Sequence, residues 1–322
     1  MPTEPRWRNL FLCADPADDI LGEPMDEGAS KDNVLRLRLW EHDGSGPVVL
    51  FLHGYLDTGR SFDAAVEALG GQVRALCLDW RGHGRSDAVA AGGSYHPLDH
   101  LKDLTRVLVC LERAGMVPEA LVAHSMGGNL ALMMAGAWPR RVRRLLVLDA
   151  FGPPPQDPSE QAARLGRALQ RMLKVRPFGR FDSRQEATAR LRQTNFGLSA
   201  QGAERMAKHA LMEDPQAPGK WTFRYDPRLK GPTPIRYPEQ TWLATFGRIT
   251  APVRVLRAQN GYVPLGELLD GRKAAIKDLE VATLDGSYHH LHVEHPDAVA
   301  KALRALLAVD VAAQGQGEGQ KA

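Results

Sequence analysis

The chain has 322 residues, of which 43% are apolar and 25% are charged, and its formal net charge is +3. These fractions are ordinary for a soluble globular protein and exclude a disordered chain, a collagen-like repeat and a disulfide-stabilised miniprotein. Its apolar stretches, of which residues 47–52 are typical, are far shorter than the roughly 20 residues of a membrane-spanning helix. Neither the N-terminal residues nor the three widely spaced cysteines resemble a secretory signal, a zinc site or a disulfide framework. We therefore expect a cytoplasmic protein without an integral membrane segment.

Strands and helices alternate in the first half of the chain. Residues 35–40 place leucines at every second position, which predicts a half-buried strand, whereas the continuous apolar run at 47–52 predicts a strand buried on both faces. Apolar residues in 100–114 repeat with a helical period. The same criteria predict further strands at 73–78, 120–123 and 142–148, and further helices at 63–69 and 129–137.

The alternation stops at the connector 152–155, and an Arg-rich helical pattern without a clear strand follows. It resumes with strands at 253–258 and 279–284 and helices at 265–276 and 296–307. Such alternation predicts a mostly parallel sheet flanked by helices, with the helical block as an insertion over the carboxyl ends of the strands. We assign residues 1–151 and 248–311 to an α/β core domain, 152–247 to a helical cap and 312–322 to a disordered tail.

The net positive charge lies in the insertion, because residues 151–250 contain 17 Lys and Arg against 9 Asp and Glu, whereas acidic residues are in excess in the rest of the chain. A basic segment can indicate nucleic-acid binding. Its arginines, however, recur at helical spacing without interleaved aromatic residues, so we expect a helix surface and no nucleic-acid partner. An anionic substrate or a membrane surface stays open as the reason for this charge.

The sharpest local motif is Ala-His-Ser-Met-Gly-Gly at residues 123–128, between a predicted strand and a predicted helix. A nucleophile elbow requires this context, because its serine sits at the tip of a strained strand-to-helix turn with small neighbours. Ser125 is then the nucleophile, and Ala123 is a mild departure from the usual glycine. The alternative is that Ser125 only caps the helix.

A second motif, His-Gly-Tyr-Leu-Asp at residues 53–57, directly follows a predicted buried strand. A glycine there allows a sharp turn that exposes backbone N–H groups. The N–H groups of Tyr55 and Met126 together could hold a developing oxyanion. The alternative is an ordinary turn at a strand end. The glycine-rich loop 79–86 is interpreted as architectural.

The third motif is the histidine-rich segment 286–296, between the last predicted strand and the last helix. A general base needs a loop imidazole within reach of the serine, and His289 fits that requirement. The cluster could instead bind a metal, but no matching Cys, Asp or His cluster stands out elsewhere, so we expect no metal. His290, His292 and His295 are expected to be loop or helix-cap residues.

These segments, in this order and at these spacings, resemble the α/β-hydrolase family from about residue 35 to residue 309. Segments 53–57, 224–229 and 258–262 resemble its serine hydrolase-like branch in particular. The resemblance implies an α/β-hydrolase fold whose cap is the insertion, with Ser125 as nucleophile and His289 as base. It also implies that Tyr55 and Met126 supply the oxyanion N–H groups. Dehalogenases and epoxide hydrolases of this fold carry Asp at the elbow, so a serine argues against both.

The acid of the triad does not follow from the resemblance, because Gly261 occupies the position where the family usually has Asp. Asp149, at the end of the predicted strand 142–148, is our candidate, since some family members place their acid there. Its alternative role is to cap a turn. Glu267 and Asp270 are lesser candidates, and an enzyme impaired by lack of an acid is the remaining possibility.

The sequence therefore predicts a serine hydrolase that cleaves a carboxylic ester of a small apolar or aromatic acid through an acyl-enzyme on Ser125. It predicts a small-molecule substrate and no cofactor, and it leaves the oligomeric state open. Cleavage of a C–C bond, lactone or thioester by the same triad stays open, as does a ligand-binding protein with a decayed triad. A weaker alternative is a surface-binding protein that uses the basic cap. Aromatic residues of the cap line a substrate pocket or form the cap's own core: Trp221, Phe223, Tyr225, Tyr237, Trp242 and Phe246.

Overall fold

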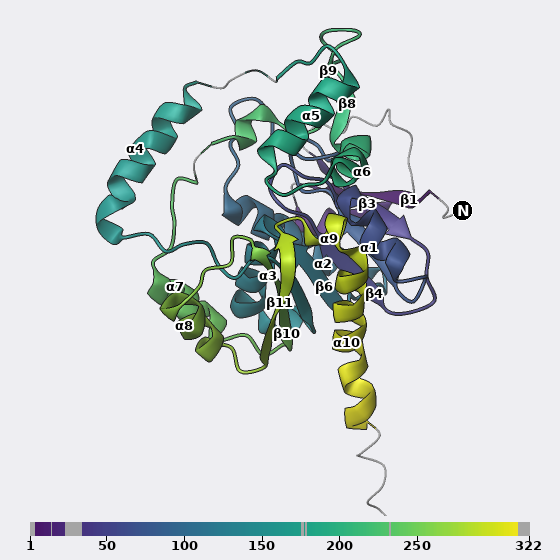
Figure 1. Cartoon of the computed structure of the whole chain (residues 1–322), viewed down its shortest axis with the longest axis vertical. Helices are drawn as coiled ribbons and strands as arrows, with labels where there is room; N and C mark the ends of the chain where they lie inside the picture. Colours follow the sequence, from purple (N-terminus) through teal and green to yellow (C-terminus); the bar gives the residue numbers. More distant parts are fainter. Residues whose placement is uncertain are drawn as a thin grey trace, which may run out of the picture.

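A nine-stranded sheet in the order β11-β10-β7-β6-β4-β5-β3-β1-β2 forms the centre of the computed structural model (Figure 1). The structure describes residues 4–13, 15–22, 34–174, 177, 179–231 and 233–314. Strands β4, β5, β6, β7, β10 and β11 pair in parallel, whereas β1, β2 and β3 form an antiparallel edge. The strands are β1 (Arg6–Leu12), β2 (Ile20–Gly22), β3 (Leu35–His42), β4 (Val48–Leu52), β5 (Arg74–Leu78), β6 (Ala120–His124), β7 (Leu145–Leu148), β10 (Val253–Asn260) and β11 (Leu279–Tyr288).

Helices cover both faces of this sheet, which explains why its central strands are apolar throughout. One face packs against α2, α3 and α7, and the other packs against α1 and α10. The helices are α1 (Asp63–Ala68), α2 (Pro97–Arg113), α3 (Met126–Ala137), α4 (Gln161–Met172), α5 (Arg184–Thr194), α6 (Ala200–Ala210), α7 (Glu239–Phe246), α8 (Glu267–Ala275), α9 (Leu291–Glu294) and α10 (Pro296–Gln314). No helix in the described ranges has the length and apolarity needed to cross a bilayer.

The insertion separates two strands that are neighbours in the sheet, since Leu148 of β7 pairs with Leu256 of β10. Helices α4 to α7 lie between these strands in the sequence, and α5 and α6 lie above the sheet in Figure 1. The exact domain boundaries stay a prediction.

Three expectations need correction. The insertion is not purely helical, because β8 (Leu211–Glu213) and β9 (Trp221–Phe223) form an antiparallel pair there. These strands have three residues each, too few for a periodic pattern. The N-terminal strands β1 and β2 were not predicted, and they extend the sheet at its antiparallel edge. Helix α10 continues through residues 312–314, which favour helix because two are alanine; the other residues of the predicted tail lie outside the described residues.

Candidate active site

Ser125 lies at the tip of a tight turn between β6 and α3, with φ 50° and ψ −114°. This conformation is unfavourable for a residue with a side chain, and such strain is typical of a nucleophile elbow. Gly127 makes the turn possible: a Cβ there would lie 2.5 Å from the Leu52 carbonyl oxygen and 2.7 Å from that of His53. The elbow therefore packs directly against the end of β4.

The structure brings Ser125, His289 and Asp149 into one hydrogen-bonded line. The Ser125 Oγ lies 2.9 Å from the His289 Nε2, and the His289 Nδ1 lies 2.6 Å from the Asp149 Oδ2. The Asp149 side chain is fully buried and that of His289 is 14% exposed. The lesser acid candidates, Glu267 and Asp270, are exposed on the first turn of α8.

The absence of a carboxylate at position 261 has a steric reason. A Cβ at Gly261 would lie 2.5 Å from the Asp149 Cγ and closer still to both carboxylate oxygens. The Asp149 carboxylate thus fills the space beside His289, where it accepts hydrogen bonds from the backbone N–H groups of Ala258 and Tyr262, both at 3.0 Å. Asp149 itself has φ 45°, a conformation that Asp tolerates better than most residues.

The turn after β4 brings a second segment to Ser125. A Cβ at Gly54 would lie 3.2 Å from the Ser125 Cβ, so the glycine allows a close approach. The next residue, Tyr55, and the first residue of α3, Met126, follow directly, and neither backbone N–H donates a hydrogen bond to another described residue. Both N–H groups are therefore available to a ligand. His83 fixes the turn by accepting from the Leu56 N–H at 3.2 Å.

Three buried side chains beneath His289 form a cluster that the sequence analysis missed. Ligand atoms of Asp57, His124 and His292 lie within 4.8 Å of one another, so these residues could hold a metal ion. Two of them already have protein partners, because the Ser61 hydroxyl lies 2.7 Å from the Asp57 Oδ2 and 3.0 Å from the His292 Nε2. His124 holds the loop of the base, with its Nε2 3.0 Å from the His289 carbonyl oxygen. The Nδ1 atoms of His124 and His292 are buried and have no hydrogen-bond partner among the described residues. The contact from His124 to the His289 carbonyl oxygen nevertheless links this cluster to the loop of the base.

Burial sets the charge of His124 and His290, whereas hydrogen bonding and nearby histidines set the charge of Asp57. Burial lowers the pKa of His124 well below its ordinary value and lowers the pKa of His290 to about 3. For Asp57, burial raises the pKa, but the hydrogen bond from His292 and the nearby histidines outweigh it and lower the pKa to about 2. His124 and His290 are consequently neutral beside the base at neutral pH.

A cavity of about 990 Å³ opens beside Ser125. Its walls combine apolar side chains, among them Leu130 and Met133 of α3, with the insertion. Of the six aromatic residues of the predicted cap, Tyr225, Tyr237 and Trp242 line the cavity. The other three, Trp221, Phe223 and Phe246, do not line it and pack in apolar clusters. Six cationic residues of the insertion also line it: Arg164, Arg171, Lys174, Arg228, Lys230 and Arg236. Of these, Arg228 forms an ion pair with Asp226 at 2.6 Å.

Sequence comparison decides the family. The family model described as "Alpha/beta hydrolase family" matches residues 49–302, which is more than half of the chain. The chain belongs to the α/β-hydrolase family. As in other members, the sheet is mostly parallel and flanked by helices, and the protein is a hydrolase.

Relatives of this hydrolase include the serine hydrolase-like branch. The chain is 26% identical to a serine hydrolase-like protein of Danio rerio over 280 residues, 84% of this chain and 83% of the relative. It is 28% identical to a 3-hydroxybutyrate-oligomer hydrolase of Cupriavidus necator over 238 residues, 71% of this chain and 77% of the relative. A crystal structure of a hypothetical protein from Pseudomonas aeruginosa PAO1 is similar with a TM-score of 0.75 and 28% identity, covering 86% of this chain and 96% of the other.

Proposed function

We propose that this hydrolase cleaves a carboxylic ester through an acyl-enzyme on Ser125, with His289 as general base and Asp149 as the acid that orients it. The observation that supports this most is the line from Ser125 through His289 to Asp149, with distances of 2.9 and 2.6 Å. A hydroxyl becomes a nucleophile when an adjacent base accepts its proton, and a third group must hold that base. No cofactor is part of the proposal.

In the first half of the reaction, the His289 Nε2 accepts the Ser125 proton while the Oγ attacks the carbonyl carbon. The backbone N–H groups of Tyr55 and Met126 stabilise the oxyanion of the tetrahedral intermediate. Asp149 favours the imidazolium and keeps its Nδ1–H in place. His289 then protonates the alkoxide of the leaving alcohol, and the C–O bond breaks. In the second half, water attacks the acyl carbon, its proton goes to His289, and Ser125 is released with the free acid.

The lining of the cavity, partly apolar and partly cationic, suggests which acid the substrate contains. Apolar residues near Ser125 suit the apolar or aromatic acid that the sequence predicts. The six cationic residues of the insertion add a requirement for negative charge. We propose that the acid carries an anionic group at the end remote from the ester. The Cupriavidus necator relative is named for 3-hydroxybutyrate oligomers, which are esters with a terminal carboxylate.

Labelling with a fluorophosphonate, followed by peptide mass spectrometry, tests the nucleophile. We expect labelling at Ser125 that is lost in His289→Ala. Absence of labelling on folded protein would contradict the proposal and favour a ligand-binding protein.

The substrate class is tested separately with two 4-nitrophenyl esters, the butyrate and the monoester of glutaric acid. We expect the glutarate to have the higher kcat/KM, and Arg171→Gln to reduce that preference. Equal kcat/KM values for both esters in the wild type would refute the anionic requirement. They would not affect the assignment of Ser125 as the nucleophile.

A further inference from the structure

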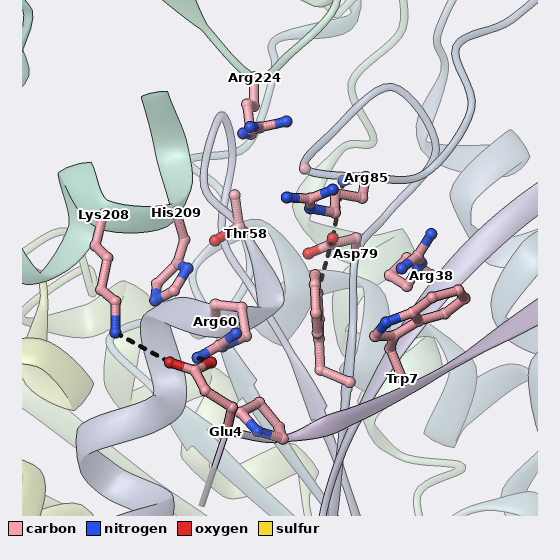
Figure 2. Close-up of a pocket in the computed structure, with 13 residues that line it drawn as sticks. Glu4, Trp7, Arg38, Thr58, Arg60, Asp79, Arg85, Lys208, His209 and Arg224 are labelled. Carbon is pink, nitrogen blue, oxygen red and sulfur yellow. Dashed lines mark hydrogen bonds and ion pairs between the residues drawn. The ribbon is translucent and has the colours of Figure 1, made fainter. Parts of the chain in front are cut away.

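A second cavity, of about 390 Å³, lies where the antiparallel edge of the sheet meets the insertion (Figure 2). Its volume is within the range of small-molecule sites. None of the residues of the proposed triad lines it. We call this second cavity the arginine cavity. The residues that line it are Glu4, Pro5, Trp7, Arg38, Trp40, Thr58, Arg60, Asp79, Gly84, Arg85, Lys208, His209 and Arg224.

Positive charge dominates the lining, with five Arg and Lys side chains against two carboxylates. Both carboxylates are engaged. Glu4 pairs with Arg60 at 3.0 Å and with Lys208 at 3.4 Å. Asp79 is buried and accepts from neutral groups: the Trp40 indole N–H at 3.0 Å and the backbone N–H groups of Gly59 and Arg85. The acids therefore leave a cationic surplus.

Arg85 and Arg224 carry this surplus. Neither forms an ion pair with any residue in the described part of the chain, and the Arg224 Nε donates only to the Leu211 carbonyl oxygen at 3.0 Å. Figure 2 shows both side chains directed at one region of the cavity from different segments. Burial, with the neighbouring Arg85 as a second cause, lowers the pKa of Arg224. The nearby Asp79 carboxylate opposes this effect by raising the pKa of Arg224, but the net direction is a lowering.

The backbone fixes these two arginines relative to each other. The Gly84 N–H donates to the Arg224 carbonyl oxygen at 2.8 Å, and the Asp226 N–H donates to the Gly82 carbonyl oxygen at 2.7 Å. The loop before Arg85 is thus hydrogen-bonded to the segment 224–226, which directly follows β9. Because the two backbone segments are already fixed, an anion has to order only the two side chains when it binds.

We propose that the arginine cavity binds a small organic anion, with a phosphate or carboxylate group held between Arg85 and Arg224. Guanidinium groups bind these planar or tetrahedral oxyanions through paired N–H donors. Trp7 and Trp40 also line the cavity, where the Arg38 guanidinium lies 3.8 Å from the Trp7 ring and the Arg60 guanidinium lies 5.1 Å from the Trp40 ring. Thr58 adds a hydroxyl. The site is distinct from the ester cavity and does not depend on hydrolysis by Ser125.

Titration with phenyl phosphate and, in parallel, with benzoate tests the site and tells a phosphate ligand from a carboxylate ligand. Tryptophan fluorescence reports the binding, because Trp7 and Trp40 line the cavity. We expect saturable binding of at least one probe. The variant R85Q/R224Q should weaken it about 100-fold, since each charge-assisted hydrogen bond contributes about tenfold or more. R85Q alone, at an exposed position, should weaken it about tenfold.

Two controls separate this site from other basic surfaces. R140Q/R167Q removes the same charge from two exposed arginines outside both cavities and should leave binding unchanged. R171Q alters the ester cavity and should also leave it unchanged. Binding that is lost in R171Q but kept in R85Q/R224Q would overturn the proposal by placing the anion beside Ser125. Absence of saturable binding of either probe to folded wild-type protein at millimolar concentrations would overturn it as well.

Discussion

Moving the acid from position 149 to position 261 tests how His289 is oriented. The Asp149 carboxylate occupies the space that a side chain at Gly261 would need, with 2.5 Å between that Cβ and the Asp149 Cγ. Asp149→Gly empties this space, and glycine accepts the φ of 45° at position 149. Gly261→Asp in the same chain then places a new carboxylate directly after the neighbouring strand β10, beside the same imidazole.

The magnitude follows from the hydrogen bond that is removed. Asp149→Gly deletes the 2.6 Å contact with the His289 Nδ1, and loss of the triad acid lowers kcat by about 10⁴ in a serine protease. That factor corresponds to about 5 kcal/mol of transition-state stabilisation. We expect D149G/G261D to recover at least about 100-fold of the loss. Gly261→Asp alone should be impaired, because two carboxylates then compete for one space.

The assay is kcat/KM for a 4-nitrophenyl ester, measured beside Ser125→Ala as the background. Asp149→Asn is the matched control, since it keeps the shape and removes the charge, and thermal unfolding shows that each variant is folded. If Asp149→Asn keeps activity within tenfold of the wild type, Asp149 is not the acid. If the double variant is folded and no more active than Asp149→Gly, the two positions do not serve the same imidazole, and the steric argument fails.

Three further predictions concern the surroundings of the site. The Tyr55 phenol donates to a backbone carbonyl of the insertion at 2.9 Å, so Tyr55→Phe should change KM by no more than about tenfold and leave kcat unchanged; a large fall in kcat would refute this. Arg272 is fully buried and bonds three backbone carbonyls at the start of the insertion as well as Glu239. Arg272→Ala should lower the free energy of unfolding by about 3–5 kcal/mol in urea titrations, whereas a loss below 1 kcal/mol would show that these contacts are exchanged for water. Burial lowers the pKa of His100 and of His290 to about 3, so between about pH 6.5 and 3 the unfolded chain binds more protons than the folded one, and stability falls as the pH falls. Each of these two histidines should lower the free energy of unfolding by about 2 kcal/mol between pH 7 and pH 5. His100→Gln should reduce the dependence of the free energy of unfolding on pH, measured in urea titrations at several pH values. An unchanged slope would mean that His100 is not neutral in the folded protein.

Local patterns were sufficient for the parts of the site that lie next to one another in the chain. The elbow around Ser125 is one strand end, one turn and one helix start, so its small residues and its apolar flanks are visible in six positions. The strand at 47–52 and its glycine turn were predicted for the same reason. The family and the hydrolase class followed from these segments and are confirmed by comparison. The roles of the individual residues stay predictions until they are tested.

Contacts between distant segments could not be derived in this way. Asp149 was one candidate among three, because the choice depends on β7 lying beside β10, which brings Asp149 next to Ala258 and Gly261. The cluster of Asp57, His124 and His292 was missed, although each residue belongs to a segment that the sequence analysis had examined. Adjacent strands in a sheet need not be adjacent in the chain, so spacing alone does not show which side chains meet.

The sequence by itself determined the alternation of strands and helices, the elbow serine and the histidine loop, because these depend on periodicity and turn chemistry within a few residues. The tertiary structure decided which side chains contact one another in the site. Ser125 meets His289 across 164 positions, and His289 meets Asp149 across 140. It also decided that Arg85 and Arg224 face one cavity, since only the docking of the insertion on the loop after β5 brings those two segments together. Such contacts depend on how buried faces pack, and chain-local patterns do not specify that packing.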